Sequence, residues 1–241
     1  MDAGVLSWLL EEAPPGVRVR ALTGLCGVPE DDPQVAEART LVLRTLDSAR
    51  DLSWMEGKGL WLTYHLTALA EAGLRRADVP VGPLVERLLA GTYDAACGDM
   101  MMLRALVMLG YGDDPRVGER LAQVAATQMP DGGWLCLHRL HKEKATKSCI
   151  KAAMHALLLA GEMAKRGLPF AGRDALVGYF LKRRLFYRTD DPAQPVLNCR
   201  PGWRMTDAFF PSEVMRVGLP MLLEALASLD AGRAPELQEA W

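Results

Sequence analysis

The stretch Thr127-Gln128-Met129-Pro130-Asp131-Gly132-Gly133-Trp134 decides the fold of this chain. It closes a helical segment, and a Gln at a helix end can hydrogen-bond the backbone of the next turn. Pro-Asp-Gly-Gly predicts a tight reversal of the chain. We expect the Trp to lie back over the neighbouring helix pair, because a large indole ring is most stable when it is buried. The segment therefore predicts a device that stacks one helix pair on the next.

This element resembles the Gln…Asp-Gly-Gly-Trp repeat of the α/α-toroid superfamily, which contains the squalene-hopene cyclases and the β-subunits of protein prenyltransferases. The resemblance implies an all-α, toroid-like arrangement of helical repeats. The chain has only three or four recognisable copies of the repeat. Its ring could therefore be closed, with a central cavity, or open, with a groove in its place. The resemblance names an architecture and no reaction, because fold and function separate easily.

Internal repeats in the sequence point the same way. The segment 65–73 lines up with 102–110, a step of 37 residues, and further copies begin at Met154 and Pro220. Apolar residues recur at spacings of three and four throughout the chain, whereas strand-like alternation is absent. Clusters of Pro and Gly separate these stretches, which predicts roughly ten helices joined by turns. Repeats of this length are typical of helix pairs that bury their apolar faces by stacking.

The first 50 residues differ from the rest. The segments 5–12 and 15–25 resemble a HEAT-type helix pair, in which Pro-x-Val-Arg opens a helix. They also resemble the opening of uncharacterised bacterial proteins with prenyltransferase-like repeats. Those proteins end with a Phe-Pro segment before a Leu-rich helix, which residues 209–214 match here. We expect one domain over 1–241, with HEAT-like helices in 1–50 and toroid-type repeats in 51–241.

The composition limits the class of protein. The chain has 241 residues, 50% of them hydrophobic, and its 28 Lys and Arg against 30 Asp and Glu give a formal charge of −2. Such a balance creates no general field for nucleic acid. No apolar run reaches the roughly 18 residues that a membrane-spanning helix needs, and the N-terminus lacks a secretory signal. The five scattered cysteines are typical of reduced thiols, so we expect a cytoplasmic protein.

Two helix openings share the sequence Asp-Asp-Pro-x-Val, at 31–35 and at 113–117. An Asp before a Pro predicts a helix N-cap followed by a Pro at the first helical position. A magnesium-diphosphate site would need further acids on the same helix face, and neither copy has them. We therefore interpret both as capping devices, and expect no magnesium there.

The reaction signatures of the superfamily are missing. Terpene cyclases use Asp-x-Asp-Asp to protonate an alkene or Asp-Asp-x-x-Asp to hold magnesium, and this chain has neither. Any activity as a terpene-cyclase-like lyase or a prenyltransferase-like transferase would have to proceed without these standard acidic motifs. The sequence leaves open whether the protein is an enzyme.

The segment 141–150 resembles the zinc and diphosphate site of protein prenyltransferases. The resemblance places Cys149 on the ligand Cys, Lys144 on the diphosphate Lys and His141 where an Arg would stand. Lys147, however, occupies the position of the ligand Asp, and an ammonium group cannot coordinate a cation. Cys149 and His155 are six residues apart and fall on different faces of a helix. We therefore expect no metal and no cofactor, and zinc on Cys149 and His155 remains the weaker alternative.

The same segment has the composition of an anion site. Lys142, Lys144, Lys147 and Lys151 cluster at an expected helix start, where unpaired N–H groups and the helix dipole favour negative charge. A second basic run follows at 182–184. In a toroid the early residues of each inner helix converge at one end of the ring, and this predicts where a cavity opens. The candidate ligand-binding residues are Trp61, Tyr64, Cys97, Met101, Trp134, His141, Lys144, Lys147, Lys151 and Phe209. The candidate catalytic residues are Asp99, Cys149 and His155.

The sequence favours a protein that binds, and in one version transforms, a mostly apolar, isoprenoid-like small molecule with an anionic end in a central helical cavity. Two alternatives from other classes stay open. A helical-repeat scaffold would bind a protein or peptide partner on its concave surface without chemistry. A HEAT-like DNA glycosylase would need a basic groove, which the charge of −2 disfavours.

Overall fold

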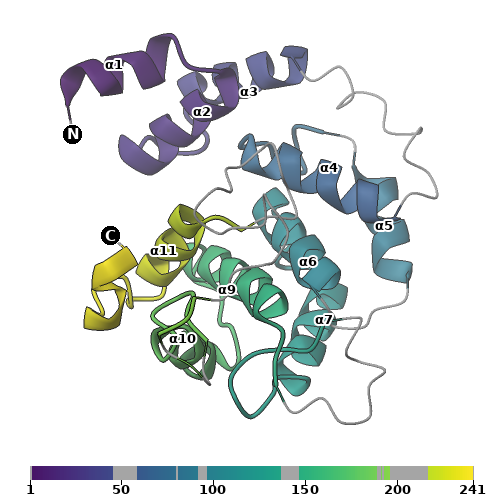
Figure 1. Cartoon of the computed structure of the whole chain (residues 1–241). Coiled ribbons are helices and arrows are strands. Elements are labelled where there is room, and N and C mark those ends of the chain that lie inside the picture. The colour runs from purple at the N-terminus through teal and green to yellow at the C-terminus, as the bar shows by residue number, and fades with distance from the viewer. Residues whose placement is uncertain are drawn as a thin grey trace. The chain divides into compact units, whose positions relative to one another are not determined.

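Helices make up the described part of the chain (Figure 1). The computed structural model describes residues 2–45, 59–79, 81–91, 97–136, 147–188, 191, 193–195 and 217–240. Within these ranges there is no strand, only two isolated bridges, Trp134 with Cys149 and Tyr187 with Pro195. The expected all-α class is confirmed. None of the helices in these ranges is both long and apolar enough to cross a membrane.

The chain folds into two compact units. Unit 1 contains Met1–Gly91 and Met108–Tyr111, and unit 2 contains Thr92–Val107 and Gly112–Trp241. The expected boundary near residue 50 falls in 46–58, outside the described residues.

Unit 1 begins with the helix pair that the sequence indicated. Its helices are α1 (Ala3–Glu11), α2 (Pro15–Arg20), the π-helical continuation η1 (Ala21–Leu25), α3 (Pro33–Thr45), α4 (Gly59–Glu71) and α5 (Gly82–Ala90). The turn after α4 packs tightly on α2, because a Cβ at Gly73 would come within 2.3 Å of Val19 Cγ1, and Gly73 has a positive φ of 82°. The buried Arg39 of α3 ties this turn down by donating to Gly73 O at 2.8 Å. Sequence-distant segments of unit 1 are thus joined by close packing and by a buried guanidinium.

Helix α1 buries none of its residues, although its sequence is largely apolar. Trp8 is 49% exposed, and Leu25 of η1 is 56% exposed. Helix α1 contacts α2 and η1 within unit 1. Unit 1 therefore carries apolar side chains that its own packing leaves exposed.

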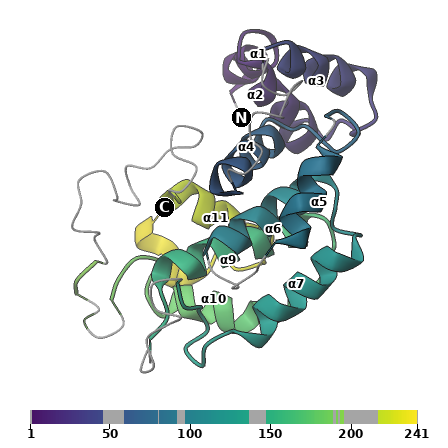
Figure 2. The ribbon, with the colours of Figure 1, turned by 90° about the vertical axis from the view of Figure 1, so that its right-hand side faces the viewer.

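Unit 2 is built around one buried helix. Its helices are α6 (Cys97–Leu109, of which Cys97–Val107 belong to this unit), α7 (Pro115–Ala126), α9 (Ile150–Lys165), α10 (Arg173–Leu181), α11 (Leu219–Ser228) and a 3₁₀ segment, η5 (Pro235–Ala240). Every residue of α9 from Ala152 to Met163 is buried. Helix α9 packs on α10 and α11, and Figures 1 and 2 both show α6 beside it. Gly161 allows the approach of α11, since a Cβ there would lie 2.9 Å from Ala225.

The two Asp-Asp-Pro segments are helix caps, as the sequence predicted. Asp32 accepts a hydrogen bond from Gln34 N at 2.8 Å where α3 begins at Pro33. Asp114 accepts from Arg116 N at 2.9 Å where α7 begins at Pro115. In both, the carboxylate satisfies a backbone donor that the first helical turn leaves unpaired.

The Gln128–Trp134 segment joins three helices of unit 2. The Trp134 side chain is fully buried, and its indole N–H donates to Val124 O of α7 at 2.7 Å. The amide of Gln128 donates to Gly132 O at 3.0 Å and to Gly172 O, just before α10, at 3.1 Å. Gly132 has a φ of 91°, and a Cβ there would lie 2.2 Å from Ala175 O of α10. These contacts confirm that Trp134 is buried and that the segment packs on neighbouring helices, whereas the stacking of repeats stays a prediction.

Replacing Trp134 tests how much this device stabilises the fold. We expect Trp134→Ala to lower the free energy of unfolding by roughly 3–5 kcal/mol, because it leaves a large cavity and removes the indole hydrogen bond to Val124 O. The half-exposed Trp8 provides the matched control, and Trp8→Ala should change stability by less than about 0.5 kcal/mol. Denaturant titrations followed by helical circular dichroism measure both. Equal losses in the two variants would contradict a structural role for the Trp134 ring.

Candidate functional site

The predicted site residues fall into three groups in the structure. Several lie at the start of two neighbouring helices of unit 2: Cys97 and Asp99 in the first turn of α6, Lys147 and Cys149 just before α9, and Lys151 and His155 within α9. His141, Lys144 and Phe209 lie outside the described residues, as do the side chains of Trp61 and Tyr64 on α4. Met101 and Trp134 lie in the core, with 1% and 0% of their surface exposed.

The start of α9 is held by the Asp131 carboxylate. Asp131 accepts a hydrogen bond from Ser148 N at 3.0 Å and a second, short one from the Ser148 hydroxyl. The next residue, Cys149, donates its N–H to Trp134 O at 2.7 Å. Because Ser148 and Trp134 are buried, this junction is shielded from water on one side. The Asp-Gly-Gly-Trp segment therefore fixes the backbone from which α9 begins.

The helix start itself is electropositive. Cys149 is the N-cap of α9 and makes no side-chain cap hydrogen bond, and the first turn of α9 has no acidic residue. Lys147 and Lys151 stand on either side of this cap. A helix of 16 residues presents partial positive charge at its first N–H groups. The arrangement can attract a carboxylate or phosphate group.

Three thiols lie near one another at the same end of unit 2. Burial raises the pKa of the Cys97 thiol, and the neighbouring Cys149 and Cys136 raise it further, while the backbone N–H of Gly98 acts in the opposite direction. All three thiols are half-buried. The raised pKa keeps Cys97 protonated at neutral pH, and a thiol is a weaker nucleophile than a thiolate.

His155 is buried in the middle of α9, where its surroundings oppose protonation. Only 3% of its surface is exposed, and burial, Arg104 and Lys151 together lower its pKa to about 4. The imidazole is therefore neutral at pH 7. A base with so low a pKa accepts protons weakly, so His155 fits a role as a neutral hydrogen-bonding group better than one as a general base.

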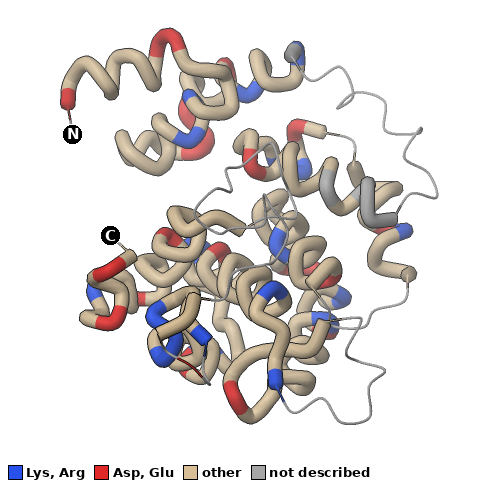
Figure 3. Tube along the Cα trace, viewed as in Figure 1, with Lys and Arg blue, Asp and Glu red and all other residues tan. Residues whose placement is uncertain are grey.

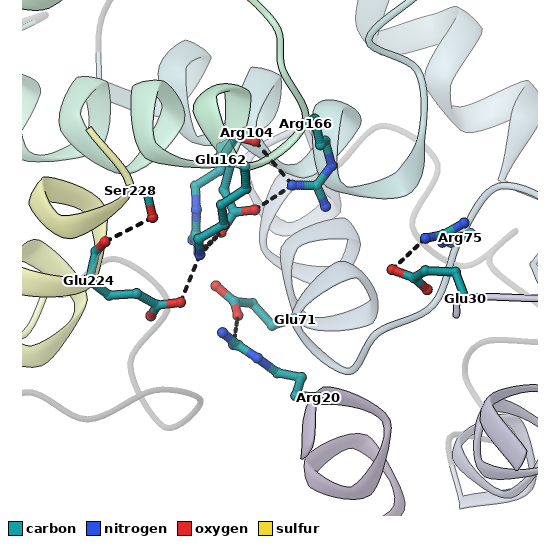
Figure 4. A network of polar contacts seen from close by, with 10 residues as sticks. Arg20, Glu30, Glu71, Arg75, Arg104, Glu162, Arg166, Glu224 and Ser228 are labelled. Atoms are coloured by element: carbon teal, nitrogen blue, oxygen red, sulfur yellow. Dashed lines mark hydrogen bonds and ion pairs between the residues drawn. The ribbon is translucent and has the colours of Figure 1, made fainter. Parts of the chain in front are cut away.

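A buried ion-pair network lies farther along α9 (Figure 4). Glu162 lies 4.0 Å from Arg104 of α6, 2.6 Å from Arg166 and 3.0 Å from Lys165, and Lys165 also contacts Glu224 of α11 at 2.7 Å. Burial alone would raise the pKa of Glu162, but Lys165, Arg104 and Arg166 outweigh it and lower the pKa to about 2. Sequence reasoning missed Arg104 and Glu162. The available signal was a charged residue inside each of two apolar helical runs.

The second basic run is engaged in other contacts. Arg183 lies over the Tyr179 ring at 4.3 Å and is buried. Arg184 pairs with Glu239 of η5 at 3.2 Å and lies over the Tyr187 ring at 4.0 Å. Figure 3 shows acidic and basic positions interspersed along both units. This run therefore anchors the end of α10 to the C-terminal segment of unit 2.

Residues of the kinds that coordinate metals do not form a metal site within the described ranges. No group of three or more His, Cys, Asp or Glu residues there has a geometry that could hold a metal ion. His138 and His141, the two histidines that precede Cys149 in the sequence, lie outside those ranges.

Comparison with known proteins adds no relative to this picture. No protein-family model, no curated protein and no solved structure matches the chain significantly.

The buried His155 should make stability depend on pH. Because its pKa is about 4 in the folded chain and near 6.5 when unfolded, the unfolded state binds more protons between these values. His155 therefore makes its full contribution to the free energy of unfolding above pH 6.5. This contribution falls as the pH drops toward 4, by about 2 kcal/mol at pH 5. Denaturant titrations at pH 7 and pH 5 measure the difference.

His155→Leu provides the control, since it fills the buried position with an apolar side chain and removes the titrating group. The loss between pH 7 and pH 5 should then shrink by most of its wild-type size. Glu162 titrates lower, so its contribution is lost only as the pH falls from about 4.5 toward 2. An unchanged pH dependence in His155→Leu would show that other groups cause it.

Proposed function

We propose that this chain is a toroid-like helical repeat protein that binds a mostly apolar, isoprenoid-like small molecule with an anionic end. The anionic group, a diphosphate or carboxylate, is held at the start of α9 by Lys147 and Lys151. The apolar part lies in the cavity that the ring of inner helices encloses. Magnesium and zinc have no part in this binding mode.

The observation that carries the proposal is the N-cap of α9, Cys149, which makes no side-chain cap hydrogen bond, whereas the Asp131 carboxylate binds one residue earlier, at Ser148. Helices α1, α3 and α7 begin with an Asp whose carboxylate accepts a backbone N–H. Helix α9 begins instead with a thiol that makes no cap hydrogen bond, between two lysines. Helices α2, α5, α10 and α11 also begin without a side-chain cap, but α9 adds a lysine on each side of its N-cap in the sequence. An external anion there would supply the negative charge that Asp supplies at the starts of α1, α3 and α7.

The architecture proposed for the cavity rests on the repeats. The copies found in the sequence correspond to α4, α6, α9 and α11, and in unit 2 the last three are neighbours. In a toroid these would be inner helices, with Cys97, Asp99, Lys147 and Cys149 at one mouth of the ring.

Transformation of the ligand is the less supported part of the proposal. The low pKa of His155 makes it a poor general base, and the raised pKa of Cys97 makes it a poor nucleophile at neutral pH. Asp99 and Cys149 remain as candidates near the anion site. Binding alone accounts for the residues that the site contains.

A second candidate function is a non-catalytic scaffold for a protein or peptide. The apolar side chains left exposed within unit 1, above all Trp8 and Leu25, favour it. Partner surfaces are enriched in such aromatic and aliphatic side chains. A scaffold would require neither the lysines at α9 nor an isoprenoid ligand.

Calorimetric titration with farnesyl diphosphate and with farnesol tests the anion site. We expect the diphosphate to bind more tightly than the alcohol and its affinity to fall with added salt, because partly exposed charges are screened over about 8 Å at physiological ionic strength. Lys147→Ala and Lys151→Ala should each weaken diphosphate binding by about 1–3 kcal/mol and leave the alcohol unaffected.

Lys182→Ala provides the matched control, because Lys182 is an exposed lysine at the opposite type of helix end, the C-cap of α10. It should leave both affinities unchanged. Equal affinity for alcohol and diphosphate, or equal effects of all three lysine variants, would contradict the anion site and favour the scaffold.

A further inference from the structure

Cys136 and Cys149 belong to two segments that the structure holds against each other. Trp134 and Cys149 form an antiparallel bridge, with Cys149 N donating to Trp134 O at 2.7 Å. Cys136 follows Trp134 by two residues. In an antiparallel pair that continues from this bridge, side chains two apart emerge on the same side, which would make Cys136 the diagonal neighbour of Cys149. Both cysteines also lie close enough to Cys97 to act on its thiol.

The distance across such a diagonal is close to what a disulfide needs. Diagonal partners in an antiparallel pair lie about 7–8 Å apart, whereas the Cα atoms of a disulfide lie about 4.4–6.8 Å apart. Cys136 lies outside every helix, so its backbone can shift by the remaining distance of roughly 1–3 Å. Cys149 is fixed by its hydrogen bond to Trp134 and by the neighbouring contacts of Ser148 with Asp131.

Cys97 completes the group from the neighbouring helix. It is the first residue of α6, and its thiol senses the charges of both Cys149 and Cys136. Its raised pKa keeps Cys97 in the less reactive thiol form at neutral pH. Half-burial leaves all three open to small reagents, whereas Cys26 is exposed in unit 1.

We propose that Cys136 and Cys149 form a reversible dithiol–disulfide pair that exchanges with low-molecular-weight disulfides of the glutathione type. This pair shares Cys149 with the proposed anion site, but it rests on the bridge between the two segments and does not require an isoprenoid ligand.

The exchange proceeds in two steps. The thiolate of one cysteine attacks a sulfur of glutathione disulfide, forms a mixed disulfide and releases one glutathione thiolate, which takes up a proton. The second protein thiol loses its proton and attacks the protein sulfur of the mixed disulfide, releasing the second glutathione. The net change oxidises two protein thiols to one disulfide and reduces one glutathione disulfide to two thiols.

Oxidation adds a covalent link beside the hydrogen bonds of Asp131 with Ser148. The disulfide ties the chain end that leaves the Asp-Gly-Gly-Trp segment to the N-cap of α9. We therefore expect oxidation to tighten the junction between these two segments.

The full-length protein, fully reduced, is equilibrated in glutathione buffers of defined ratio, quenched with acid, alkylated and mapped by mass spectrometry of its peptides. We expect a peptide pair linked through Cys136 and Cys149. The oxidised fraction should follow the ratio of glutathione squared to glutathione disulfide, because two glutathione molecules are released for each protein disulfide.

Serine variants identify the pair. Cys136→Ser and Cys149→Ser should each abolish the cross-link and leave the remaining thiol as a glutathione mixed disulfide, whose amount follows the first power of glutathione. Cys97→Ser and the exposed control Cys26→Ser should retain the cross-link, and circular dichroism checks that every variant keeps its helices. A cross-link through Cys97, Cys26 or Cys199, or mixed disulfides alone in the wild type, would overturn the proposal.

Discussion

The paired hydrogen bonds from Ser148 to the Asp131 carboxylate are the contact on which unit 2 depends. They link the reversal after α7 to the residue that precedes α9, and α9 is the helix on which α10 and α11 pack. Gly132 and Gly133 make this contact possible. A Cβ atom at Gly132 would lie 2.2 Å from Ala175 O, and one at Gly133 would lie 2.6 Å from Ser148 Cβ. Only glycine lets the carboxylate, the indole and α10 approach one another so closely.

Because α9 is buried from Ala152 to Met163, its polar side chains must either find partners or stay uncharged. Glu162 is surrounded by three cations and stays ionised, whereas His155 faces Arg104 and Lys151 and stays neutral. One helix thus carries a buried anion, whose pKa is lowered mainly by Lys165, and an uncharged imidazole, whose pKa is lowered mainly by burial, and Arg104 contributes to both shifts. Removing one partner of such a buried pair generally costs several kcal/mol, because the other charge is left uncompensated. The network therefore restricts how α6 can sit on α9.

Local features of the sequence predicted local features of the structure well. The reversal at Asp131-Gly132-Gly133, the burial of Trp134 and the caps at Asp32 and Asp114 each depend on residues within a few positions of one another. The contact of Arg104 with Glu162 depends instead on how two helices pack, which periodicity does not specify. The same reason applies to Met101, a ligand candidate that lies in the core, and to the gathering of Cys97, Cys136 and Cys149. The apolar sequence of α1 predicted a helix, yet not that its side chains would remain exposed in unit 1.

A double-mutant cycle between Asp131 and Ser148 tests whether the two side chains join the reversal after α7 to the start of α9. The free energy of unfolding is measured for the wild type, Asp131→Ala, Ser148→Ala and the double variant. A hydrogen bond from a buried hydroxyl to a carboxylate predicts a coupling energy of about 1–3 kcal/mol. Losses that add within about 0.3 kcal/mol would show that the two side chains act independently, and would contradict the account.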